Sequence, residues 1–279
     1  MSYKTILTIL TDTDQVAEVL PHAIAFAEDV GAHLDVLCLG IDRTQVGYYY
    51  AGATAVIYQE TLAQAQEAAT EVEAAARTYL SRTDIPWGIE ALVAQSANIG
   101  VLVARHARFS DLVILPKPYG KEQPSDAPIL IEAALFHGRA PVLVLADKAA
   151  LTASPRRVVV AWNESEEALV AARRALPLLK AAELVDILIV APERHPANMT
   201  DPGAELSRML TRHGVKVEVT IAPQTLPRVS EVINRHVTDT GADMVVMGAY
   251  GHSRFREAIL GGATRNQLEH AAVPVLMAH

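Results

Sequence analysis

Short continuous apolar runs recur along the chain, and amphipathic segments separate them. In the first half the apolar runs lie at residues 4–10, 34–39, 87–93, 111–115 and 141–145. Apolar residues at helical spacing occupy residues 16–30, 61–80, 99–107 and 129–136. Continuous apolar runs are typical of strands buried on both faces of a parallel sheet, because neither face meets water. The alternation therefore predicts βαβ units and an α/β fold.

The second half repeats this order after a polar, alanine-rich bridge. Its apolar runs lie at residues 156–162, 184–190, 215–221, 244–247 and 273–277, and its amphipathic segments at 166–180, 204–213, 228–240 and 263–270. The sequence DLVIL at 111–115 is matched by DMVVM at 243–247, and PVLVL at 141–145 by PVLMA at 274–278. Such evenly spaced landmarks indicate a duplicated unit. We predict two domains, residues 1–147 and 155–279, each large enough for its own core.

Composition argues against several classes of function. Hydrophobic residues make up 51% of the chain, yet no apolar run is long enough to span a membrane, so this content is expected in folded cores. The formal net charge of −8 argues against a nucleic-acid surface, which needs a basic face. The opening residues suit a first strand and not a signal peptide. We therefore expect a cytoplasmic protein that binds neither membrane nor nucleic acid.

The side chains give no sign of a metal centre or of a nucleophile. Cys38 is the only cysteine, which excludes an internal disulfide and a multi-cysteine metal site, and we expect its thiol to be buried and inert. The 10 histidines do not show the spacing that metal ligands have. No G-x-S-x-G elbow is present. Neither a metal ligand nor a catalytic residue is predicted.

The most informative stretch reads MGAYGHSRFREAILGGAT at residues 247–264 and is called the glycine-rich segment. Gly248 and Gly251 follow a predicted strand, where the lack of a Cβ lets a ligand approach the backbone. Gly261 and Gly262 precede a predicted helix, whose unpaired N–H groups and about half a positive charge attract an anion. The corresponding stretch of the first half, PKPYGKEQPSDAPIL, is rich in proline, which has no N–H to offer. A phosphate site is therefore favoured in the second half.

On these residues the chain resembles the universal stress protein family in its tandem form, with two such domains on one polypeptide. The resemblance covers nearly the whole chain. Its most specific part is the family's nucleotide signature, in which glycines are separated by two and then nine residues, as Gly248, Gly251 and Gly261 are. Gly262 stands where the family usually has Ser or Thr, although Thr264 follows closely.

The resemblance implies a fold and a ligand. Each half would be a doubly wound five-stranded parallel sheet of strand order 3-2-1-4-5, of the nucleotide-binding α-hydrolase-like type, and some members bind an adenine nucleotide. Ligands of such sheets lie beyond the carboxyl ends of the strands, where the strand order reverses. Nucleotide-binding members usually carry Asp after the first strand. Asn163 stands there in the second half, and Asp12 in the first.

We therefore expect a stress-response protein that binds ATP, or AMP or ADP, in its second domain and acts as a sensor and not as an enzyme. Mg²⁺ would accompany a triphosphate, because a helix end cannot balance its charge. The first domain would be a degenerate partner. The predicted nucleotide-binding residues are Trp162, Asn163, Val190, Ala191, Met247, Gly248, Gly251, His252, Arg254, Gly261, Gly262, Ala263 and Thr264.

Two other interpretations stay open. A slow ATPase or phosphotransferase would hold its nucleotide with the same glycine-rich segment, although the sequence offers no evident catalytic base. A non-nucleotide interaction or small-ligand-binding protein would pair its two halves through their last strands, 141–145 and 274–277, and further homodimer formation is compatible with it. The tyrosine-rich stretch 45–58 has no counterpart in the second half, and we expect it to cover the first domain's vacant crevice or to form an interface.

Overall fold

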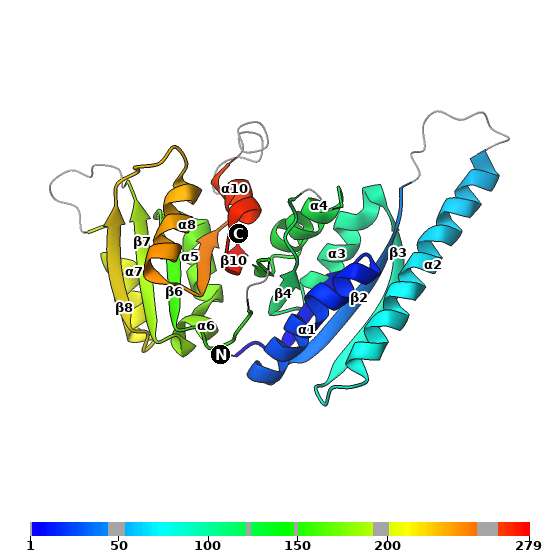
Figure 1. The fold of residues 1–279 in the computed structure, drawn as a ribbon, viewed down its shortest axis with the longest axis horizontal. Coiled ribbons are helices and arrows are strands. Elements are labelled where there is room, and N and C mark those ends of the chain that lie inside the picture. The colour runs from blue at the N-terminus through cyan, green and yellow to red at the C-terminus, as the bar shows by residue number, and fades with distance from the viewer. Residues whose placement is uncertain (1, 44–53, 121–123, 148–149, 192–200, 250–261) are drawn as a thin grey trace. The chain divides into compact units, whose positions relative to one another are not determined.

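A computed structural model of the protein describes residues 2–43, 54–120, 124–147, 150–191, 201–249 and 262–279. Its contacts divide the chain into two compact units. The N-terminal unit comprises Tyr3–Pro116 and Pro124–Ala140, and the C-terminal unit comprises Met1–Ser2, Lys117–Gln123 and Pro141–His279. Figure 1 shows strands and helices alternating along the chain, as the sequence predicts.

The N-terminal unit contains the first four strands and their helices. In chain order these are β1 Thr5–Leu10, α1 Thr13–Val30, β2 His33–Asp42, α2 Thr54–Leu80, β3 Trp87–Gln95, the 3₁₀ turn η1 Ser96–Asn98, α3 Ile99–Ala107, β4 Leu112–Leu115, α4 Ala127–Glu132 and the π-helix η2 Ala133–His137. The parallel pairs β1–β2, β2–β3 and β1–β4 place β1 in the middle. The strand order is therefore β3-β2-β1-β4.

The C-terminal unit begins with the last strand of the first half. In chain order its elements are β5 Val142–Val144, β6 Arg157–Ala161, α5 Glu166–Arg174, α6 Leu176–Ala181, β7 Leu184–Val190, α7 Ala204–Arg212, β8 Val217–Ala222, α8 Val229–Thr240, β9 Met244–Gly248, α10 Ala263–His270 and β10 Val275–Ala278. The order β8-β7-β6-β9-β10 is the predicted 3-2-1-4-5, and these pairs are parallel. The doubly wound α/β fold is thus confirmed.

The strand β10 also pairs with β5, and this pair is antiparallel. Val275, Leu276 and Met277 lie opposite Val144, Leu143 and Val142. Both strands are buried along their whole length. The predicted pairing of the last strands of the two halves is therefore confirmed.

In each half, an aspartate before the fourth strand holds the start of the first strand by hydrogen bonds. The carboxylate of Asp111, just before β4, accepts the backbone N–H groups of Lys4 and Thr5 at 2.7 and 3.1 Å. The carboxylate of Asp243, just before β9, accepts those of Arg156 and Arg157 at 2.7 and 2.9 Å. The matching sequence landmarks thus correspond to matching contacts, as a duplication predicts.

Three helices differ from the sequence-based expectation. The predicted helix at 166–180 is divided into α5 and α6, because Pro177 in the first turn of α6 has no N–H to continue the helical ladder. Helix α2 begins at Thr54, so the end of the tyrosine-rich stretch is helical, while residues 44–53 lie outside the described part of the chain. Helix α4 continues as the π-helix η2, beyond the predicted 129–136. Among the described residues, no helix is long and apolar enough to cross a membrane.

Candidate functional site

A cavity of about 220 Å³ opens at the carboxyl ends of β6, β7 and β9 in the C-terminal unit. Here the strand order reverses, because the chain runs from β6 outward to β8 and then returns to place β9 on the other side of β6. This is where open parallel sheets bind ligands. The cavity brings together predicted site residues from all three strand ends, namely Trp162, Asn163, Val190, Met247 and Gly248.

Other parts of the cavity wall lie outside the predicted set of nucleotide-binding residues. Val229 and Ile233 contribute from α8, Ser165 and Glu167 from the start of α5, and Leu188 from β7. The two α8 residues are four apart and therefore lie on one helix face. Helical periodicity could have indicated an inward face there, but only the packing shows that this face meets the cavity.

Trp162 and Asn163 are both held by local hydrogen bonds. The indole Nε1–H of Trp162 donates to the carbonyl oxygen of Pro202 at 2.8 Å. The side-chain oxygen of Asn163 accepts the N–H of Ser165 at 3.2 Å, and the Ser165 hydroxyl accepts the N–H of Ala168 at 3.2 Å to cap α5. Asn163 therefore shapes the turn into α5.

Backbone in the left-handed region borders the same cavity. Glu164 has a φ of 61° directly after Asn163, and Ala191 has a φ of 44° directly after β7. Non-glycine residues adopt this region rarely and at a cost of roughly 1–3 kcal/mol, often at functional sites. Ala191 itself is exposed and follows the lining residue Val190.

The space beside Gly248 is filled by α5. A Cβ on Gly248 would lie 2.6 Å from the backbone nitrogen of Ala168 and 2.8 Å from the backbone carbon of Glu167. The sequence suggested that this glycine leaves room for a ligand. The structure gives it a packing role, because α5 needs that room.

The start of α10 stands beside the cavity wall. Gly262 is the N-cap, its carbonyl oxygen accepts the N–H of Asn266 at 3.1 Å, and Thr264 is only 3% exposed. The guanidinium of Arg228 donates to the side-chain oxygen of Asn266 at 3.1 Å, and Arg228 precedes the wall residue Val229. Ala263 is the first residue of α10. The predicted residues Gly251, His252, Arg254 and Gly261 lie outside the described part of the chain.

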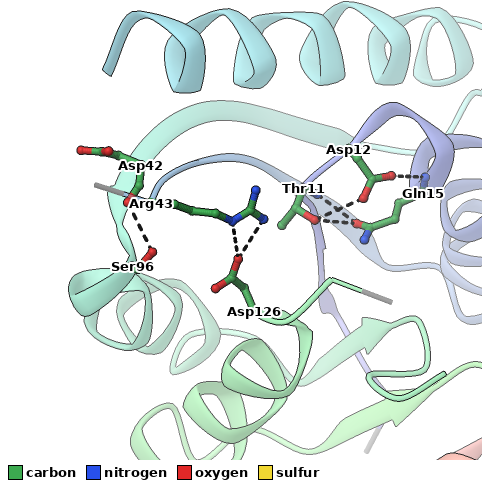
Figure 2. A network of polar contacts seen from close by, with 7 residues as sticks. All are labelled: Thr11, Asp12, Gln15, Asp42, Arg43, Ser96 and Asp126. Atoms are coloured by element: carbon green, nitrogen blue, oxygen red, sulfur yellow. Dashed lines mark hydrogen bonds and ion pairs between the residues drawn. The ribbon is translucent and has the colours of Figure 1, made fainter. Parts of the chain in front are cut away.

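In the N-terminal unit, the carboxyl ends of the equivalent strands carry a polar network (Figure 2). The Asp12 carboxylate, predicted at a ligand position, accepts the N–H of Gln15 at 2.9 Å and caps α1. After β2, Nε and Nη2 of Arg43 donate to one carboxylate oxygen of Asp126 at 3.0 and 2.9 Å. Asp126 is 7% exposed and directly precedes α4. Figure 2 shows the Arg43 guanidinium directed at Asp126.

A larger cavity, of about 520 Å³, lies elsewhere in the N-terminal unit. It opens on the sheet face beside α3, with Asp35, Glu90, Arg105 and His106 among its lining residues. The smaller cavity is the better candidate for the predicted site. It lies at the switch point, the place where the strand order reverses, and predicted residues line it.

The described part of the chain offers little for redox or metal chemistry. No group of three or more His, Cys, Asp or Glu side chains there is arranged to hold a metal ion. Burial, with a smaller contribution from Glu73, raises the pKa of the Cys38 thiol to about 12, and Arg77 opposes this shift. The thiol is therefore protonated at neutral pH, in line with the predicted inert cysteine.

Comparison with known proteins identifies the second half most clearly. Residues 155–279 match the model of the universal stress protein family. Universal stress protein Slr1230 from Synechocystis sp. (strain ATCC 27184 / PCC 6803 / Kazusa) is 35% identical over 69 residues, which is 25% of this chain. The match spans 23% of that relative's length.

Solved structures match over nearly the whole chain. A universal stress protein from Archaeoglobus fulgidus DSM 4304 has a TM-score of 0.68 and 18% identity, over 98% of this chain and 95% of that one. A Pseudomonas aeruginosa UCBPP-PA14 protein with a provisional universal stress protein name has a TM-score of 0.54 and 14% identity, over 99% and 93%. At these identities the likeness establishes the fold alone.

Proposed function

We propose that the C-terminal unit, whose residues 155–279 match the model of the universal stress protein family, binds ATP or a related adenine nucleotide and acts as a sensor in a stress response. The observation that carries this proposal is the cavity at the switch point, lined by Trp162, Asn163, Val190, Met247 and Gly248. A cytoplasmic location and the domain bounds 1–147 and 155–279 stay predictions.

The cavity suits the base or the ribose of such a ligand. Its walls are mostly apolar, and Leu188, Val229 and Ile233 line it together with Trp162 and Asn163. A volume of about 220 Å³ is below the roughly 300 Å³ at which pockets for drug-sized ligands begin. A base or ribose would therefore enter it, backbone near Ala191 would border it, and the phosphates would lie outside.

The phosphates would extend toward the start of α10. Gly262, Ala263 and Thr264 would offer N–H groups there, at the positive end of the helix. Gly251, His252, Arg254 and Gly261 complete the proposed set. Mg²⁺ would balance the charge that the helix leaves uncompensated, because a helix end supplies only about half a charge.

We propose one nucleotide site per chain. In the N-terminal unit the buried carboxylate of Asp126 already pairs with Arg43, close to the ends of β1 and β2. That carboxylate offsets the positive charge of the Arg43 guanidinium and so lowers its attraction for a phosphate. Asp12 is likewise occupied in capping α1. These contacts support the proposal that the first half does not bind a nucleotide.

Calorimetric titration of the nucleotide-free full chain with Mg-ATP tests the proposal. We expect one site per chain. Val229→Trp should abolish binding by filling the cavity, whereas Val101→Trp, at a 74% exposed position of α3, should leave it intact. Gly261→Val should also abolish binding, and Gly100→Val, where a Cβ meets nothing within 4 Å, is its control. An absence of heat up to millimolar Mg-ATP would overturn the proposal.

A further inference from the structure

The loop after β4 leaves the first half and joins the C-terminal unit. Its described residues, 117–120, belong to that unit by their contacts, although they precede β5 in the chain. The Lys117 side chain is 10% exposed, and its ammonium donates to the Asp147 carboxylate at 3.0 Å. Pro116 and Pro118 on either side are buried. The described start of this loop is therefore anchored.

This anchored loop presents Tyr119 to α10. The guanidinium carbon of Arg265 lies over the Tyr119 ring, 5.0 Å from its centroid. That distance is within the roughly 6 Å of an effective cation–π contact. Arg265 is otherwise exposed, so the ring is a contact that limits where its guanidinium can lie.

Arg265 stands at an electrostatically unfavourable place. It lies in the first turn of α10, where the helix dipole repels a cation, and this turn contains no acidic residue. Among the other helices of the C-terminal unit, the first turns of α5, α7 and α8 carry Glu166 and Glu167, Glu205 and Glu231, whereas the first turn of α6 also has no acidic residue. A cation held at such an end gains a favourable partner when an anion sits there as well.

Resting on the proposed function, we propose that Tyr119 positions Arg265 to bind the terminal phosphates of a nucleoside di- or triphosphate. Arg265 is the phosphate contact, and Tyr119 is a positioning residue that acts through it. The loop that lost its glycines in the first half would thus complete the phosphate end of the site in the second. The site then prefers nucleotides with distal phosphates over adenosine.

The test compares Mg-ATP and adenosine in calorimetric titrations of full-chain variants. Arg265→Gln should weaken Mg-ATP binding about tenfold or more, the scale of a lost charged hydrogen bond. Tyr119→Leu should weaken it about two- to fivefold, the scale of an exposed cation–π contact. Tyr119→Phe keeps the ring and should restore wild-type affinity. Adenosine affinity should be the same in all of these variants.

A matched control separates a local contact from a change in net charge. Arg212→Gln makes the same charge change on α7, directly before β8 and hence at the amino end of the strands. Its Mg-ATP affinity should equal that of the wild type. Equal Mg-ATP affinities of wild type, Tyr119→Leu and Arg265→Gln would overturn this inference and leave the nucleotide site standing. A wild type that binds neither ligand would overturn the proposed function and the inference with it.

Discussion

At the scale of single residues, Gly248 shows how one glycine satisfies two demands. It belongs to the signature that indicates a nucleotide, and its lack of a Cβ also makes room for α5. Sequence spacing cannot separate the two roles, because both require the same missing atom.

Gly248→Ala should therefore destabilise the protein even without ligand. The new Cβ would press on the backbone of Glu167 and Ala168, and overpacking of this kind costs about 1–3 kcal/mol. Gly100→Ala is the control, because its Cβ meets nothing within 4 Å and alanine is the better helix former. The measurement is the free energy of unfolding in urea. Equal free energies in the two variants would contradict the packing role.

The residues that follow each strand could be predicted from the sequence, whereas the distant residues that they contact could not. Trp162, Asn163, Val190 and Met247 follow from the strand pattern and the expected switch point, and the structure places them around one cavity. The contact of Trp162 with Pro202 joins segments that no local pattern connects. The Arg43–Asp126 pair likewise joins distant segments, and neither residue stood out in the sequence.

At the scale of elements, equivalent strands of the two halves carry an aspartate at the same position, but the two aspartates have different partners. Asp186 of β7 is 1% exposed, and one carboxylate oxygen contacts Nε2 of His236 on α8 at 2.5 Å. Asp35 has the same place in β2, but its partner at 3.1 Å is His33, and both side chains are about half exposed. His106 of α3 lines the cavity beside Asp35. Helix α8 is thus tied to its sheet by a buried polar contact.

His236→Leu should therefore destabilise the C-terminal unit by about 3 kcal/mol, the scale of a buried charge left without its partner. His106→Leu is the matched control in the first half and should change stability by less than about 0.5 kcal/mol, because Asp35 there is bonded to His33 and about half exposed. Urea unfolding of both variants measures the difference. Similar losses of unfolding free energy in the two variants would show that the buried Asp186–His236 contact adds nothing to stability.

At the scale of the whole molecule, β5 belongs to the first half by sequence and to the C-terminal unit by contacts. Its antiparallel pairing with β10 covers an apolar strand whose residues are at most 2% exposed. An uncovered strand edge of this composition would be a template for pairing with another chain.

A fragment of residues 155–279 should therefore self-associate through β10. The full chain retains β5 over β10 and should self-associate less at the same micromolar concentration. Sedimentation velocity distinguishes the two. If the fragment associates no more than the full chain does, β5 is dispensable for covering β10.

The sequence by itself determined the periodic features of this protein. Apolar runs and helical spacing are local, so they fixed the alternating α/β order, the duplication and the carboxyl-end location of the predicted site. Tertiary structure alone decided which side chains meet. It gave Gly248 a packing role, paired Arg43 with Asp126, and brought Tyr119 to Arg265 across a long stretch of chain. Such contacts depend on how elements pack, and the period of a local pattern contains no information about that packing.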